Sequence, residues 1–480
     1  MWKRLLGRSS KRDPGALPLH DPEATASPRT AEEWLALAKR KHDQGHPDEA
    51  LAAYERAMAL GAPLKSLYVT VGTLYLTQGR YAPASALFAK MAAEQSDSAD
   101  AWCLLGAAHH GERRYAAAAS SLGHALQLQP AHPEAHFNLG LARFELGDLA
   151  GASASFAQCA ALRRGAPWNL DPAAALMRKH APPFEPIDMA VNEIKLRHDC
   201  EQLEYLLELG GLPKAYRAVL EDYQALYGEL RGRVDAYALV PFDAERHPWV
   251  ARTYKRPMSI ADARLPDGPL IHPELDCRAV EDRYLNANPN IVVCDGLLTP
   301  EAMRALRAFC RESTFWNNIK PGYLGSYFYD GFCSGLLLRL AWELRARLPR
   351  VIREHPLQMM WGYKCDSTLP GLGVHADEAA VNVNFWLTED EANLDPEHGG
   401  LLVHTHQAPR EWGFARFNSD SQTVQDYLAS VGSDPVRVPY RANRAVIFDS
   451  DLFHATDRPR FREGYLNRRI NVTLLYGSRA

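Results

Sequence analysis

Large side chains in the first third of the chain return at one fixed interval. Trp34, Tyr68, Trp102 and His136 are each 34 residues apart. The same interval separates small residues (Ala50, Ala84, Ala118, Ala152) and a second large series (Tyr54, Phe88, Leu122, Phe156). Such a pattern predicts paired helices, each pair burying its apolar face on its neighbours in a solenoid. Residues at the same place in successive units, Gly45, Gly79 and Gly147, mark the turn within a pair, where Arg113 stands in the third unit.

From about residue 289 the period changes from helical to alternating. Apolar and polar residues alternate around Trp361, from Val381 to Trp386 and from Arg469 to Leu474, which predicts short strands. A strand at 291–293 and helices at 299–311 and 331–347 precede them. Between the two regions, prolines at 167–186 mark a boundary, 187–230 predict a helical hairpin, and 232–288 look irregular. The expected fold is multidomain α + β.

Composition narrows the class of protein. A chain of 480 residues is too long for one core, and its net charge of −4 shows no basic excess that would favour nucleic acid. With no apolar run of about 18 residues, we expect no transmembrane segment. Residues 1–29 are expected to be a disordered leader. The eight cysteines are scattered singly, which favours a reducing, cytoplasmic location.

The 34-residue period resembles the tetratricopeptide repeat (TPR), a helix–turn–helix unit with aromatic, Leu-Gly and Ala positions in this order. The matching dipeptides here include Leu105-Gly106 and Leu139-Gly140. The resemblance implies four repeats over 30–166, followed by a linker over 167–288. It also implies that a protein or peptide partner binds the repeats, although a purely structural or dimerising role stays open.

Candidate chemistry lies near the end of the chain, in His375-Ala376-Asp377 and the distant His454. Residues two apart on an extended segment point the same way, so His375 and Asp377 can reach one metal ion. His454 follows the predicted strand at 445–449 and can join them from a neighbouring strand. Two imidazoles and a carboxylate suit Fe(II) and leave positions open. His404 and His406 are a weaker alternative, because no carboxylate accompanies them.

These residues, followed by Arg469 on the last strand, resemble the Fe(II)- and 2-oxoglutarate-dependent dioxygenases, including prolyl-hydroxylase-like members. The resemblance covers roughly 290–478 and implies a double-stranded β-helix (jelly roll) over 289–480. His375, Asp377 and His454 would be the metal ligands and catalytic centre. Arg469 would bind the distal carboxylate of 2-oxoglutarate as a bidentate pair, in preference to Arg468 on the apolar strand face.

Tyr363 and Asn384, on strands near the metal motif, are further candidates for binding the oxo acid, with structural roles as the alternative. The implied cofactors are Fe(II), 2-oxoglutarate and O₂, and the implied activity is hydroxylation of a protein side chain or peptide that the TPR domain recruits. Two other readings remain open. The substrate would be a small metabolite with the repeats as an assembly platform, or the chain would be a TPR scaffold with an inactive oxygenase fold.

Overall fold

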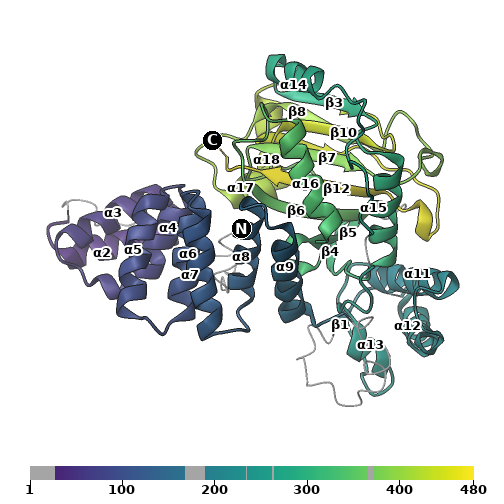
Figure 1. Cartoon of the computed structure of the whole chain (residues 1–480), viewed down its shortest axis with the longest axis horizontal. Helices are drawn as coiled ribbons and strands as arrows, with labels where there is room; N and C mark the ends of the chain where they lie inside the picture. The colour runs from purple at the N-terminus through teal and green to yellow at the C-terminus, as the bar shows by residue number, and fades with distance from the viewer. Residues whose placement is uncertain (1–27, 168–189, 234, 262–263, 366–370, 480) are drawn as a thin grey trace. The chain divides into compact units, whose positions relative to one another are not determined.

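The computed structural model describes residues 28–167, 190–233, 235–261, 264–365 and 371–479 (Figure 1). Contacts divide the chain into two compact units, Met1–Leu146 and Gly147–Ala480. Most of the expected leader, residues 1–27, lies outside the described residues, as does 168–189 of the expected linker.

The first unit consists of antiparallel helix pairs. Its helices are α2 (Ala31–Asp43), α3 (Pro47–Ala59), α4 (Tyr68–Thr77), α5 (Tyr81–Glu94), α6 (Ala99–Gly111), α7 (Tyr115–Leu128) and α8 (Pro133–Glu145), with a 3₁₀ turn η1 (Leu64–Ser66). Thr30 begins the series with a capping box, in which its hydroxyl accepts from the Glu33 amide and the Glu33 carboxylate accepts from the Thr30 amide. The predicted period of paired helices is thus present.

The small residues of the repeat pattern lie where paired helices approach closely. A Cβ on Gly72 would stand 2.3 Å from the Phe88 ring, and one on Gly106 would stand 2.5 Å from Leu122. The turn positions also follow the period. Gly45 and Gly79 have φ of 81° and 68°, and Arg113 adopts φ of 61° in the third pair, where glycine is missing.

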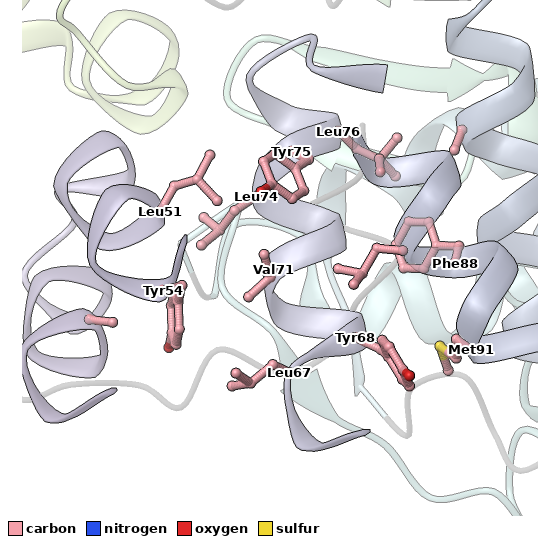
Figure 2. Packing of buried hydrophobic residues seen from close by; sticks show 14 of the residues in the cluster. Leu51, Tyr54, Leu67, Tyr68, Val71, Leu74, Tyr75, Leu76, Phe88 and Met91 are labelled. Carbon is pink, nitrogen blue, oxygen red and sulfur yellow. The ribbon is translucent and has the colours of Figure 1, made fainter. Parts of the chain in front are cut away.

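Large residues fill the space between these helices. Figure 2 shows Tyr54, Val71 and Phe88 within one cluster, and each is buried. The cluster draws on successive helices rather than on distant parts of the chain, so each pair depends on its neighbour for burial.

The second unit begins with α9 (Leu149–Arg164), the helix that completes the fourth expected repeat. The predicted hairpin is confirmed as α11 (Glu193–Leu209) and α12 (Arg217–Leu230), with the turn η3 (Lys214–Tyr216) between them. The prediction that 232–288 is irregular is partly wrong, because α13 (Pro248–Thr253) and α14 (Cys277–Asn286) form there. Both are short, and prolines around them hid their period. A small pair, β1 (Ala190–Val191) and β2 (Val240–Pro241), joins antiparallel.

Two antiparallel sheets form the rest of this unit. The larger has the order β3-β10-β7-β12-β6-β5-β4, and the smaller the order β11-β8-β9. In chain order the strands are β3 (Ile291–Asp295), β4 (Asn318–Lys320), β5 (Tyr323–Tyr327), β6 (Leu357–Cys365), β7 (Val381–Trp386), β8 (Leu401–Gln407), β9 (Pro435–Val438), β10 (Arg444–Asp449), β11 (Leu452–Thr456) and β12 (Ile470–Tyr476).

Helices cover one face of the larger sheet. The helices and short turns that connect the strands are α15 (Pro300–Glu312), η4 (Phe328–Asp330), α16 (Gly335–Arg347), η5 (Asp390–Ala392), α17 (Phe414–Ser419), α18 (Ser421–Ser430) and η6 (Tyr465–Asn467). Of these, α17 and α18 pack against β11 of the smaller sheet rather than on the larger one. Figure 1 shows α16 running across the strands, and the Tyr476 hydroxyl of β12 donates to the Ala341 carbonyl of α16. The predicted helix at 299–311 is confirmed as α15 with Thr299 as its N-cap.

The opposite face of the larger sheet looks toward the smaller sheet. Trp386 of β7 and Phe448 of β10 share an apolar cluster with Leu401 and Val403 of β8. Because side chains alternate along β7, Asn382 and Asn384 lie on the same face as Trp386. The polar residues of β7 are therefore turned into the space between the sheets, which is where the candidate site lies.

Candidate functional site

The structure brings together the three residues that the sequence motif singled out. The ligand atoms of His375, Asp377 and His454 lie within 4.8 Å of one another, and all three residues are buried. His375 Nε2 is 3.8 Å from Asp377 Oδ1, and His454 Nε2 is 3.4 Å from Asp377 Oδ2. Within the described residues, this is the one group of three or more His, Cys, Asp or Glu side chains arranged closely enough to hold a metal ion.

Backbone carbonyls fix the orientation of both imidazoles. His375 Nδ1 lies 2.9 Å from the Gly373 carbonyl, and His454 Nδ1 lies 3.0 Å from the Leu452 carbonyl. A carbonyl oxygen can only accept, so each Nδ1 carries the proton. With the proton on Nδ1, the neutral form of each ring presents its Nε2 lone pair to the centre of the cluster, as a metal ligand requires.

Burial and charge set the ionisation of the cluster. Burial, reinforced by the neighbouring His454, lowers the pKa of His375 to about 4. Burial would by itself raise the pKa of Asp377, but the adjacent His454 and His375 and a hydrogen bond from Asn382 lower it. At neutral pH His375 is therefore neutral and Asp377 is ionised.

Backbone pairing holds the ligands at fixed positions. His375 and His454 exchange both backbone hydrogen bonds, at 3.0 and 2.7 Å, so the segment containing His375 extends the smaller sheet beside β11. The residue between the first two ligands, Ala376, donates its N–H to the Phe417 carbonyl at 3.0 Å, and its carbonyl accepts from Asn418 Nδ2 at 2.9 Å. Helix α17 thereby holds the middle of the motif.

A polar pocket adjoins the three ligands. Its lining includes Trp361, Tyr363, Leu372, Asn382, Asn384, Leu401, Thr456, Arg469, Asn471 and Thr473, together with the ligands themselves. Arg469 is 2% exposed, and it donates to the carbonyls of Gly399 at 2.7 Å and Gly400 at 3.2 Å and to Asn471 Oδ1 at 3.2 Å. No carboxylate of the described residues pairs with it, although buried cations ordinarily have an anionic partner.

The two adjacent arginines have different surroundings. Arg468 Nε donates to Glu201 Oε2 of α11 at 2.8 Å, so its charge is paired on the side of the sheet away from the pocket. Arg469 lines the pocket with the three ligands. The opposite directions expected from strand alternation are present.

The other two candidates also line this pocket. The Tyr363 hydroxyl lies 3.4 Å from that of Tyr327, and burial raises its pKa. Asn384 Nδ2 donates to Thr473 Oγ1 at 2.9 Å, while its Oδ1 is buried without a partner.

Asn382 is a residue that the sequence reasoning did not single out. Its Nδ2 donates to Asp377 Oδ2 at 3.1 Å, and its Oδ1 is buried without a partner. A carboxylate can only accept, so this contact fixes the orientation of the amide. The signal was present in the sequence, because Asn382 is two residues before Asn384 and shares its strand face. Asn418 carried no such signal, since it acts from a helix whose position depends on the tertiary fold.

His404 and His406 are not part of the ligand cluster. Both lie on β8, and burial lowers the pKa of His404. The metal-capable group found among the described residues does not contain either one.

Comparisons with known proteins bear on the helical region. A tetratricopeptide repeat family model matches residues 99–132 and 133–165, which are the third and fourth expected units. Tetratricopeptide repeats therefore occupy the N-terminal region, and such repeats commonly mediate binding between proteins. The match ends at residue 165, with helix α9, and reaches none of the strands.

Solved structures similar to the chain include MamA and a protein described as a TPR protein. MamA (residues 41 to the end) from Desulfovibrio magneticus RS-1 has 20% identity, with 28% of this chain and 75% of that chain covered and a TM-score of 0.26. TTC0263, a thermophilic TPR protein of Thermus thermophilus, has 24% identity, with 28% and 74% covered and a TM-score of 0.24. No curated protein matches the chain. Among the described helices, none combines the length and apolar character needed to cross a membrane.

Proposed function

We propose that the second unit is an Fe(II)- and 2-oxoglutarate-dependent dioxygenase that hydroxylates a protein side chain or peptide recruited by the TPR region. The observation that carries this proposal is the convergence of two oriented imidazoles and one carboxylate on a pocket that also contains a buried arginine. Two nitrogen ligands and one carboxylate are the donor set of non-haem Fe(II) oxygenases.

The donor set fits the proposed metal for chemical reasons. Both Nε2 lone pairs are available because each Nδ1 proton is bonded to a carbonyl. Asp377 supplies a negative charge that offsets part of the charge of a divalent ion. Three protein ligands leave room for a 2-oxo acid and for O₂. When bound, iron and 2-oxoglutarate would supply the oxidising chemistry, and the protein's part is to bind, orient and exclude water.

Arg469 fits the distal carboxylate of a 2-oxo acid. Its guanidinium is buried in the pocket wall with no carboxylate of the described residues beside it, so an anionic ligand would complete the pair. Four of the five N–H donors already contact Gly399, Gly400, Asn471 and, weakly at 3.6 Å, Cys365 Sγ. A bidentate bond to the ligand would therefore require the weak contact to Cys365 to be released. Tyr363 and Asn384 would complete the polar wall.

The architecture supports the same proposal. Two antiparallel sheets with an apolar core between them, and with the ligands at the edge of the smaller sheet, fit the double-stranded β-helix expected of this class. Under this proposal residues from about 289 to 480 form the catalytic domain.

A second candidate function has its own support. The family model that matches the chain covers a repeat region, and such regions commonly act as scaffolds. A TPR scaffold with a silent second unit, or a hydroxylase of a small metabolite with the repeats as a platform, would fit that match equally well. These alternatives differ from the main proposal in whether the second unit binds both cofactors and what it then modifies.

An anaerobic titration tests the proposal without a known substrate. Fe(II) and then 2-oxoglutarate are added to the purified protein, and the weak visible charge-transfer absorption of the chelate is recorded. We expect the band in the wild type, its loss in His375→Ala and a weaker affinity for 2-oxoglutarate in Arg469→Ala. The matched control is His404→Ala, a neighbouring half-buried histidine outside the cluster, which should keep the band. A wild-type protein with no band would favour the scaffold.

A further inference from the structure

Helix α9 has two structural roles. Its residues lie within the fourth tetratricopeptide repeat, whose family match ends at residue 165. Its contacts nevertheless group it with the sheet-rich unit, where it packs on η4, the single turn that follows β5, and on α16. The last helix of the repeats is thus also part of the wall of the proposed catalytic unit.

A buried ion pair joins α9 to η4. Arg164 Nε and Nη2 lie 3.3 and 3.1 Å from the two carboxylate oxygens of Asp330, which is 4% exposed. Asn318 Nδ2 donates to the same carboxylate at 2.9 Å. The guanidinium and carboxylate are held as a two-point contact, which fixes their relative orientation as well as their distance.

Aromatic packing strengthens the same junction. The rings of Phe156 on α9 and Phe328 on η4 have centroids 4.0 Å apart, and Arg163 lies 5.2 Å from the centre of the Tyr329 ring. All three residues of η4 therefore contact α9.

The turn is connected directly to the candidate site. Tyr327 is the residue before η4, and its hydroxyl lies 3.4 Å from that of Tyr363. In the sheet Tyr327 is paired with Trp361, and their ring centroids are 6.2 Å apart. Tyr363 and Trp361 both line the pocket beside the metal-ligand cluster. Helix α9 is thus connected to the pocket wall through η4 and Tyr327.

We propose that Arg164 is a positioning residue for this pocket: by holding η4, it fixes Tyr327 and, through it, the Trp361 and Tyr363 side of the pocket. The metal ligands lie on other segments, at 375–377 and on β11, so this wall can shift while the metal site stays intact. The use of 2-oxoglutarate as a probe rests on the proposed function, whereas the packing change itself does not.

The first test measures ligand affinity in the full chain. Arg164→Met should weaken 2-oxoglutarate binding about fivefold in the anaerobic Fe(II) titration. The affinity for Co(II), measured without 2-oxoglutarate, should not change. Arg164→Lys, which keeps the charge but loses the two-point contact, should fall between. The matched control is Arg339→Met, which removes an arginine from a more exposed ion pair of the same unit, with Glu343 at 3.0 Å, and should leave 2-oxoglutarate affinity unchanged.

A second variant guards against loss of folding. Tyr327→Phe removes one hydroxyl and leaves the junction between α9 and η4 in place, so it should fold and still weaken 2-oxoglutarate binding. Unchanged affinity in both Tyr327→Phe and a folded Arg164→Met would overturn the proposal.

A cofactor-free readout separates this inference from the proposed function. The indole N–H signal of Trp361, assigned by its loss in Trp361→Phe, should move in ¹⁵N NMR spectra of Arg164→Met and Tyr327→Phe but not of Arg339→Met. If the wild type binds no 2-oxoglutarate, the proposed function fails and this signal alone decides. A Trp361 signal that does not move in either variant would then contradict the positioning role.

Discussion

The repeat region and the sheet-rich region differ in how far apart in the sequence their contacting residues lie. In the repeats, a position such as Gly72 meets its partner Phe88 sixteen residues later, and the same spacing recurs in Gly106 and Leu122. In the second unit, Asp377 and His454 meet across a separation of 77 residues, and Arg164 of α9 meets Asp330 of η4 across 166. A repeat of short period can be recognised from the sequence alone. A site assembled from distant strands cannot, because it depends on how the chain folds.

This difference predicts how substitutions in the two regions affect the protein. A substitution in one repeat should act on that repeat and its neighbours, because solenoid stability is close to a sum of nearest-neighbour terms. A substitution at the ligand cluster should act on function while leaving most of the packing in place. Five predictions test this contrast, beginning with the complete loss of metal binding and ending with a change in backbone strain at one turn.

Loss of one ligand should remove the metal response altogether. Wild-type protein in metal at 100 times its Kd should gain about 2.7 kcal/mol of unfolding free energy, since the metal binds the folded state. His375→Ala should gain none and should form no succinate from 2-oxoglutarate. Calorimetry with and without Co(II) checks the first point, and His404→Ala serves as control. Metal-dependent stabilisation of His375→Ala would contradict the assignment of the ligands.

A core truncation in the repeats should be costly but local. Phe88 is fully buried between α4 and α5, and Phe88→Ala should cost about 3–5 kcal/mol of repeat stability. Chemical denaturation should show an earlier transition for the helical signal, while Co(II) affinity stays at the wild-type value. A simultaneous loss of metal binding would break the contrast between the two regions.

Removing the amide that holds Asp377 should weaken metal binding by about 10–100-fold, as for other residues that orient a ligand. Asn382→Leu removes the bond to Asp377 Oδ2. Asn384→Leu is the matched control, because it is a buried amide on the same face of β7 that bonds Thr473 rather than a ligand. Titration with Co(II) gives both affinities. Equal losses in the two variants would show that Asn382 acts through general packing.

Two glycines of the third repeat should respond with opposite signs. Gly106→Ala would place its Cβ 2.5 Å from Leu122 and should cost about 1–3 kcal/mol through overpacking. Gly123→Ala meets nothing within 4 Å on the neighbouring helix and should stabilise α7 by about 0.5–1 kcal/mol. Urea unfolding of both variants compares the free energies. Stabilisation of both variants would mean that helix propensity, not close approach, decides the effect.

The smallest effect is expected at the exceptional turn. Arg113 holds φ of 61°, a region that costs a side-chain-bearing residue roughly 1 kcal/mol. Arg113→Gly should therefore raise the unfolding free energy by up to about that amount, whereas Gly79→Ala, at φ of 68°, should lower it. A destabilised Arg113→Gly variant would show that contacts of the arginine outweigh the backbone strain.

The sequence was sufficient for features that repeat or that carry a motif. The 34-residue spacing predicted both the helix pairs and the turn at Arg113, and strand alternation predicted the faces of β7 and β12. The ligand motif predicted three residues that the structure brings together. Asn382 could have been found from its spacing to Asn384, because both follow one strand face.

Other features depend on packing that no local pattern records. The attachment of α9 to η4 depends on an ion pair between residues 166 positions apart. The hydrogen bond from Asn418 to the Ala376 carbonyl depends on the position of helix α17 in the fold. Helices α13 and α14, of six and ten residues, are too short for a clear period. These are the elements that tertiary contacts, rather than propensity, hold in place.

The backbone exchange between His375 and His454 also links metal to the dynamics of the sheet edge. Their amide protons are bonded to each other's carbonyls, so neither can exchange with water unless this pairing opens. An ion that joins the two side chains must be released before the strands can part. Hydrogen exchange at these two amides should therefore slow in proportion to the metal concentration above its Kd. The exchange rate at the edge of the smaller sheet would then report how often the metal ion leaves its site.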